Sequence, residues 1–340
     1  MARILLMSFA LLDFRGEILS KFWGKIKVRY DRDNLSRLSA EIGNINYNRF
    51  MLMDLREEDN ILDEVLSSVS KLICRTPFID DVLVLDNSTC ADARLRIFGG
   101  DGREAEFCGN GTLYTLSKLK SEGYGPKVSL ETGAGIKEGH IEAEGCSIQI
   151  GQVQADSFFS DKGYIKKLQD KELKYLGSVW AGEPHVVFQA TGSWITQKFS
   201  RENFEKICAK ISHSADVEGG ANVTVVFDKK MDGFGIRTFE RGALRMTACC
   251  GSGSVAAVAT VFGSSAFEKD QENPSPIDAV TVHSQGGTHR VSFKENSWWL
   301  HGCTTRLAQG LVGDFFDSNL PPDKGHVPVS YPLMALTQAR

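Results

Sequence analysis

One five-residue pattern occurs twice in this chain, and each copy carries a thiol in a glycine-rich setting. Residues 108–112 read Cys-Gly-Asn-Gly-Thr and residues 250–254 read Cys-Gly-Ser-Gly-Ser, and an apolar run of helical character follows each copy. With 8 Cys and 33 Gly in 340 residues, chance would give about 0.08 copies of Cys-Gly-x-Gly. The repeat therefore predicts a duplicated fold with one thiol in each half.

A thiol at the start of a helix suits both anion binding and proton transfer. The first helical turn has unpaired backbone N–H groups and about half a positive charge, so it binds carboxylates, and glycine lets a ligand approach the backbone. The same potential is expected to lower the pKa of each thiol below its free value of about 8.5. Two thiols on opposite sides of one carbon, Cys108 and Cys250, can remove a proton from one face and return it on the other, which is racemase chemistry.

The elements that must position these thiols follow from the apolar periodicity, which predicts alternating strands and helices. Short strands are expected at 50–53, 82–85, 94–98, 128–130, 148–150, 185–188, 223–227, 235–240, 279–282 and 298–300. Helices are expected at 60–73, from Cys108 to about Gly123, at 202–212 and after Cys250. In each half, a strand, a turn and an acidic residue precede the Cys-Gly-x-Gly copy, so the halves should be built alike.

Composition narrows the class of protein. A net charge of −4 gives no basic surface for nucleic acid. The eight cysteines include no Cys-x-x-Cys pair and no zinc ligand set, so we expect reduced thiols in a cytoplasmic protein. The apolar run at 4–12 is too short to span a bilayer and has no small-x-small cleavage site, so no membrane contact is expected. We expect that run to form a buried strand or helix.

The sequence around both cysteines resembles the two catalytic signatures of the diaminopimelate epimerase family. Residues 96–111 resemble the first signature and residues 239–253 the second. Weaker matches fall in family order at 48–54, 132–136, 182–185, 222–223 and 285–287. The resemblance covers about residues 40–312, and it implies an α/β fold of two pseudo-symmetric halves, each a β-sheet wrapped around a central helix.

The resemblance also implies a domain plan and a set of partners. An N-terminal extension (1–35) is followed by a first half (36–153) with Cys108 and a second half (154–305) with Cys250. A C-terminal segment (306–340) is expected to return to the first half. The family uses no cofactor and no metal, and its partner is a small amino-acid substrate. A homodimer is one assembly that the sequence leaves open.

Site residues are carried over position by position. Cys108 and Cys250 are implied as the acid/base pair, with His185 assisting near them and Glu240 holding the α-ammonium of the substrate. The amides implied to grip the α-carboxylate are those of Gly109, Asn110, Gly251 and Ser252. The positions that match structural or substrate-binding residues of the family are Asn48, Asn222 and Arg241.

Departures from the family pattern point to the substrate. Gly99 and Glu183 stand where the family has asparagines that bind the distal end of diaminopimelate, and Arg245-Met246 stands where it has Glu-Thr. A carboxylate at 183 would repel a distal carboxylate and attract a cation, because an unpaired buried charge is costly. We therefore expect a substrate with a basic or neutral side chain, such as lysine, arginine, ornithine, histidine or diaminobutyrate. Diaminopimelate itself is the alternative.

Three other functions are open on the residues alone. A cysteine-nucleophile hydrolase would pair His185 with one thiol, but it leaves the second motif unexplained. A silent amino-acid-binding protein would bind without exchanging the α-hydrogen. An isomerase that moves a double bond, as phenazine-pathway proteins do, would lack the cysteine pair. Cys249 is expected to be a core or neighbouring residue, and His289 a polar strand residue.

Overall fold

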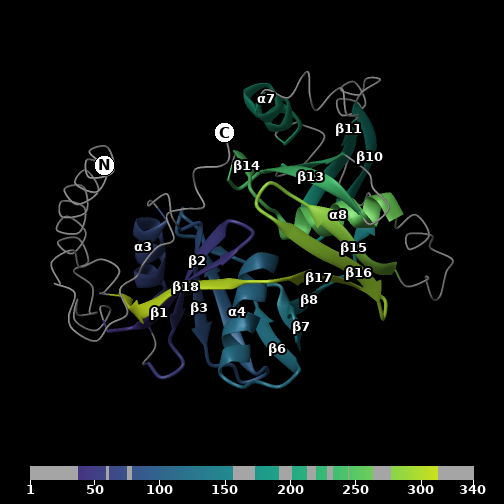
Figure 1. Cartoon of the computed structure of the whole chain (residues 1–340). Helices are drawn as coiled ribbons and strands as arrows, with labels where there is room; N and C mark the ends of the chain where they lie inside the picture. Colours follow the sequence, from purple (N-terminus) through teal and green to yellow (C-terminus); the bar gives the residue numbers. More distant parts are fainter. Residues whose placement is uncertain are drawn as a thin grey trace, which may run out of the picture.

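The protein folds into two lobes, each with one helix enclosed by strands (Figure 1). This computed structural model describes residues 37–58, 61–74, 79–155, 173–190, 201–212, 220–227, 233–243, 245–262 and 277–312. The predicted N-terminal extension, with its apolar run at 4–12, lies outside the described residues, as does most of the predicted C-terminal segment.

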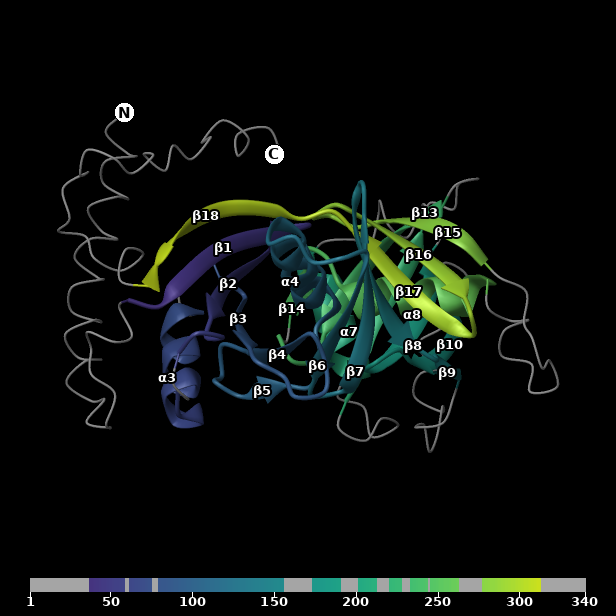
Figure 2. The same cartoon turned by 90° about the horizontal axis from the view of Figure 1, so that it is seen from below.

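The first lobe holds α4 at its centre and α3 on its outside (Figures 1 and 2). Its elements are β1 (Ser39–Ile45), β2 (Asn48–Asp54), α3 (Asp63–Ile73), β3 (Asp81–Asp86), β4 (Ala93–Phe98), β5 (Glu104–Ala105), α4 (Gly109–Ser121), β6 (Lys127–Thr132), β7 (Gly135–Glu142) and β8 (Gly145–Gly151). Strands β2 and β3 pair in parallel around the α3 crossover, and β4 and β6 pair in parallel around the α4 crossover. The other neighbours along this sheet are antiparallel.

The second lobe repeats this plan element by element. Its elements are β10 (Leu173–Trp180), β11 (Pro184–Ala190), α7 (Arg201–Ser212), β12 (Asn222–Phe227), β13 (Gly233–Glu240), β14 (Arg245–Thr247), α8 (Gly251–Phe262), β15 (Ile277–His283), β16 (Thr288–Lys294) and β17 (Ser297–Gly302). Parallel pairs again enclose the helices, with α7 between β11 and β12 and α8 between β13 and β15. The predicted pseudo-symmetric α/β fold, with a sheet around a central helix in each half, is confirmed.

The lobes are joined by strand pairing. Strand β8 pairs antiparallel with β17, which makes the two sheets continuous. The strand that follows β8, β9 (Gln154–Ala155), pairs with β10 of the second lobe, and the strand that follows β17, β18 (Thr305–Leu311), pairs with β1 of the first. Figure 2 shows β18 lying along β1. Each lobe therefore receives one strand from the other, while the predicted domain boundaries themselves stay predictions.

Local sequence accounts for the helices. In α3, Val65, Leu66, Val69 and Ile73 recur at helical spacing and are buried, and the acidic and basic residues fall at the ends that complement the helix dipole. The central helices differ because they are buried nearly all round. In α8 the run from Val255 to Ala259 is buried, and small side chains let the surrounding strands approach.

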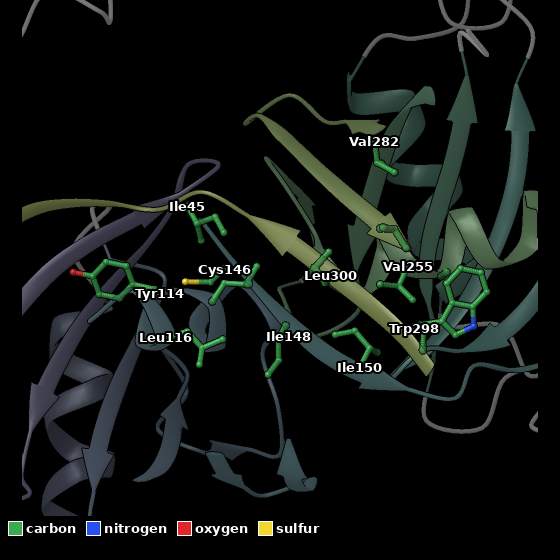
Figure 3. Close-up of a cluster of buried hydrophobic side chains, with 14 of the residues drawn as sticks. Ile45, Tyr114, Leu116, Cys146, Ile148, Ile150, Val255, Val282, Trp298 and Leu300 are labelled. Atoms are coloured by element: carbon green, nitrogen blue, oxygen red, sulfur yellow. The ribbon is translucent and has the colours of Figure 1, made fainter. Parts of the chain in front are cut away.

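One hydrophobic core connects the two central helices. It contains residues of α4, α8, β8 and β17 in a single cluster of buried side chains. Figure 3 shows Leu300 of β17 in the middle of this core, with Tyr114 and Leu116 of α4 on one side and Val255 of α8 on the other. Separate outer cores lie under α3 and α7. The shared core places the starts of α4 and α8 against each other.

Candidate active site

Both cysteines cap a central helix in the same way. Cys108 is the N-cap of α4, and its Sγ accepts the Gly111 N–H at 3.4 Å. Cys250 precedes α8, and its Sγ accepts the Gly253 N–H at 3.3 Å. The hydroxyl residue after the second glycine repeats its role as well: Thr112 donates to the Cys108 carbonyl at 2.8 Å, and Ser254 donates to the Cys250 carbonyl at 3.0 Å.

The two helix starts lie close together, and glycine permits this. A Cβ at Gly251 would lie 3.4 Å from Asn110 Oδ1 and 3.7 Å from the Asn110 backbone nitrogen, so the first turn of α8 faces the first turn of α4. A Cβ at Gly109 would lie 2.9 Å from Leu300 Cδ2, and one at Gly251 would lie 2.8 Å from the same atom. Both helix starts therefore pack against one leucine side chain, with no room for an added methyl group.

Cys250 is buried and Cys108 is partly buried, and nearby carboxyl groups change the acidity of both thiols. Burial raises the pKa of Cys108, and the nearby Asp81 and Glu240 raise it further. Burial also raises the pKa of Cys250 well above its ordinary value, and Glu240 adds to this. The helix amides act in the opposite direction but are outweighed. The expectation that the helix start lowers the thiol pKa below its free value is therefore wrong for this arrangement, because burial and carboxyl groups dominate.

His185 reaches the second thiol through a serine. It is fully buried in β11, and its Nε2 lies 3.0 Å from Ser252 Oγ, which in turn lies 3.4 Å from Cys250 Sγ. Its Nδ1 lies 3.2 Å from Thr224 Oγ1, which fixes the ring from the other side. Burial lowers the pKa of His185 to about 3, and Arg241 contributes. The imidazole is therefore neutral at physiological pH.

Glu240 ends β13 beside the second cysteine. The Thr247 hydroxyl donates to Glu240 Oε1 at 2.5 Å. Burial raises the pKa of Glu240, whereas its hydrogen bonds with Thr247 and Cys250 lower it. A carboxyl group thus lies within hydrogen-bonding reach of one cysteine and close enough to influence the pKa of the other.

Three further predicted residues form a connected group. Asn222 Nδ2 donates to Glu183 Oε2 at 2.9 Å, and the Arg241 backbone N–H donates to Asn222 Oδ1 at 2.9 Å. Arg241 Nε lies 3.6 Å from Glu183 Oε2 in an ion pair. The side chain of Glu183 is 45% exposed, so it is neither unpaired nor deeply buried. The premise that its charge is buried and lacks a partner is therefore wrong.

Asn48 and Asp81 begin two neighbouring strands of the first lobe, β2 and β3. Asn48 begins β2 directly after the turn of the β1–β2 hairpin, and Asn46 in that turn donates to the Thr288 carbonyl of the second lobe at 3.1 Å. Asp81 was not predicted from the sequence. It begins β3, and its Oδ1 would lie 3.8 Å from a Cβ at Gly99. Burial raises the pKa of Asp81 to about 7, with contributions from Asp80, Glu240 and Asp101.

Within the described ranges, no group of three or more His, Cys, Asp and Glu side chains is arranged to hold a metal ion. Within the same ranges, no helix is both long and apolar enough to cross a membrane.

Comparison with known proteins shows the family. Over 284 residues the chain is 30% identical to the diaminopimelate epimerase of Methanothrix thermoacetophila, which covers 79% of this chain and 94% of that protein. Over 248 residues it is 30% identical to the diaminopimelate epimerase of Caldanaerobacter subterraneus, covering 68% and 85%. No family model matches the chain.

Solved structures show the same fold at low sequence identity. A phenazine biosynthesis protein of the PhzF family from Bacillus anthracis superposes with a TM-score of 0.60 at 16% identity, covering 81% of this chain and 98% of that one. A hydroxyproline epimerase from Agrobacterium vitis, with bound trans-4-hydroxy-L-proline, superposes with a TM-score of 0.56 at 14% identity, covering 82% and 91%. The sequence relatives therefore decide the family: the chain belongs to the diaminopimelate epimerase family, and it is an isomerase of the cofactor-independent epimerase and racemase type.

Proposed function

We propose that this protein inverts the α-carbon of a free amino acid by a two-base mechanism in which Cys108 and Cys250 act on opposite faces. The observation that carries the proposal is the equivalent capping geometry. Each Sγ accepts an N–H three residues ahead, at 3.4 and 3.3 Å, and both helix starts pack against Leu300. Inversion by proton transfer needs one base and one acid that flank the same carbon.

The substrate carboxylate binds where the two helix starts meet. The backbone N–H groups of Gly109, Asn110, Gly251 and Ser252 belong to the first turns of α4 and α8. The first amides of a helix have no backbone carbonyl partner within that helix, and the two helix dipoles add a positive potential at the same place. A carboxylate held there is anchored directly beside the α-carbon that reacts.

The substrate ammonium pairs with Glu240 and thereby activates the thiols. Glu240 raises the pKa of both Cys108 and Cys250. A cation beside that carboxyl group offsets its negative charge, so the pKa of each thiol falls when the amino acid binds. The positive charge that favours the thiolate is therefore the ammonium group of the substrate itself.

The reaction then needs only two proton transfers. The thiolate on one face takes the α-proton, and the electron pair of the C–H bond is delocalised into the carboxylate held by the amides. The thiol on the other face gives its proton to the carbon and becomes the thiolate. His185 stays neutral and orients Ser252, whose hydroxyl lies 3.4 Å from Cys250 Sγ. The reverse reaction uses the same residues with their protonation states exchanged.

A substrate with a basic or neutral side chain fits the charges beyond the α-carbon. The Arg241 guanidinium already pairs with Glu183, so a distal carboxylate would compete with that carboxylate for its cation. The Asp81 carboxyl group adds negative charge near Gly99 once it ionises. Asn48 and Asn222 supply neutral polar groups. These charges favour a cation or a neutral group over an anion.

Diaminopimelate epimerisation is the second candidate. It is favoured by one observation, the 30% identity to proteins that carry that name. The hydrolase interpretation is not retained, because the family consists of isomerases and His185 contacts Ser252 rather than a thiol.

The test is an NMR screen in D₂O of the common amino acids together with ornithine, diaminobutyrate and diaminopimelate. We expect loss of the α-proton signal for one or a few basic or neutral amino acids. Cys108→Ser and Cys250→Ser should each abolish racemisation, and Cys90→Ser, which alters an exposed thiol outside the site, should not. Binding without exchange would refute the enzymatic proposal, and exchange of diaminopimelate alone would refute the substrate class.

A further inference from the structure

His289 lies between the two central helices and contacts both of them. It belongs to β16 and is 1% exposed. Its Nε2 lies 2.9 Å from Asn110 Oδ1 of α4, and its Nδ1 lies 3.0 Å from Ser254 Oγ of α8. Cys249 Sγ lies 3.4 Å from the same Nδ1. A single imidazole ring thus joins the start of one central helix to the start of the other.

The hydrogen-bond partners of His289 determine which of its ring nitrogens carries the proton. Burial lowers the pKa of His289 to about 4, so the ring is neutral at pH 7. Asn110 Oδ1 can only accept, so Nε2 carries the ring proton and donates it. Nδ1 then accepts from the Ser254 hydroxyl or from the Cys249 thiol, which keeps its proton because burial raises its pKa to about 11. Every group in the bridge is neutral and has a partner.

Each of the two helix residues that His289 contacts is also hydrogen-bonded to one of the proposed catalytic cysteines. Asn110 is the second residue of α4, and its backbone N–H is directed to Cys108 Sγ. The single proton of the Ser254 hydroxyl is shared between His289 Nδ1 and the carbonyl oxygen of Cys250, each 3.0 Å from Oγ. Leu300 packs against both helix starts as well, but an apolar contact does not define direction, whereas hydrogen bonds do.

We propose that His289 is a positioning residue that holds the first turn of α4 in register with the first turn of α8. The inference rests on the proposed function, because the register matters for activity only if both thiols and the amides of both helices act on one substrate. His289 need not touch the substrate, and its effect passes through Asn110 and Ser254.

The kinetic test compares two substitutions with a matched control. His289→Leu keeps the approximate size of the ring and removes both hydrogen bonds, whereas His289→Gln keeps one donor and one acceptor. Since a misplacement of about 1 Å can cost about 10²-fold in rate, His289→Leu should lower kcat/KM by about 10²-fold, and His289→Gln should restore most of it. His301→Leu is the control, because His301 is mostly buried on the neighbouring strand and bonds Ser292 at 2.9 Å. That control should leave kcat and KM of the folded protein unchanged.

A second test is independent of catalysis. Asn110→Ala and Ser254→Ala should have non-additive effects on unfolding by urea in the wild-type background and additive effects in the His289→Leu background. If no amino acid is racemised but this pattern appears, the proposed function fails and the bridge stands. Additive effects in both backgrounds would overturn the bridge. Unchanged kinetics in His289→Leu would overturn the positioning role even if the coupling were found.

Discussion

Asp81→Asn should stabilise the protein, and the gain should grow with pH. Asp81 is the first residue of β3, where burial raises the pKa of its carboxyl group to about 7 and the carboxyl groups of Asp80, Glu240 and Asp101 add to the rise. In the unfolded chain its pKa returns to the ordinary 3.8. Ionisation is therefore easier in the unfolded state, and this carboxyl group opposes folding whenever the pH favours its charged form.

The free-energy cost of the Asp81 carboxyl group depends on pH. Below pH 3.8 the group is protonated in both states and contributes nothing. Between that pH and about 7 only the unfolded state releases the proton, so the cost rises, and above about 7 it is constant. At about 1.4 kcal/mol per pKa unit, a pKa of about 7 in place of 3.8 corresponds to about 4 kcal/mol as an upper limit. We expect Asp81→Asn to gain about 2–4 kcal/mol at pH 8 and almost nothing at pH 4.

The assay is urea unfolding of wild type and variant at pH 4, 5, 6, 7 and 8. Asp92→Asn is the control of opposite sign: Asp92 accepts the Ser129 N–H and hydroxyl, both at 2.7 Å, and these bonds lower its pKa. Asp92→Asn should lower the free energy of unfolding at pH values above the ordinary pKa of an aspartate, and this loss should stay constant between pH 5 and 8. A gain for Asp81→Asn that is the same at pH 4 and pH 8 would refute the reasoning, because the carboxyl group would then not carry a raised pKa.

Four further outcomes are expected. Cys108→Ser and Cys250→Ser should each retain elimination of halide from one enantiomer of a β-halogenated amino acid, measured as halide release, because elimination needs only one base, and the two variants should prefer opposite enantiomers. Glu183→Asn should raise exchange of diaminopimelate relative to basic amino acids in D₂O, since it removes the carboxylate that pairs with the Arg241 guanidinium, and an unchanged preference would count against the charge argument. Leu300→Ala should lower the free energy of unfolding by about 2–5 kcal/mol, measured in urea, because Leu300 is fully buried and both helix starts rest on it. The pH profile of kcat should show no inflection from His185 between pH 5 and 8, because its pKa is about 3.

Much of the fold could be predicted from the sequence because the relevant signals are local. Apolar runs such as 82–85 and 223–227 became the buried strands β3 and β12, and the helical spacing at 60–73 became α3. Strand β1 was not predicted, because Glu41 interrupts its pattern. That carboxylate is 2% exposed, and it is stabilised by Lys118 at 3.2 Å and by the Tyr114 hydroxyl at 3.1 Å. A buried charge with distant partners cannot be recognised from neighbouring residues.

The residues of the candidate site also fall into two groups, those that sequence motifs identify and those that only the folded structure brings together. The two Cys-Gly-x-Gly copies predicted the starts of the central helices. The weaker motifs selected Glu183, Asn222 and Arg241, which contact one another in the structure. Asp81 and His289 were missed because neither lies in a motif. Asp81 gains its character from burial and from carboxyl groups of other segments, and His289 from Asn110, which is 179 residues away in sequence. Such residues become visible only when the chain has folded.

The acidity of the two thiols is not decided by the helix start alone. A helix start alone favours a thiolate, but burial opposes ionisation of both thiols, as do Glu240 near both and Asp81 near Cys108. Both forces are needed in a symmetric two-base reaction. If the helix amides prevailed, both cysteines would be thiolates and neither could donate a proton. If burial prevailed with substrate bound, neither could accept one. Under the mechanism we propose, the thiols stay neutral until a cation reaches Glu240, and one of them then ionises. That one-proton difference between the two sulfurs would let the reaction run in either direction.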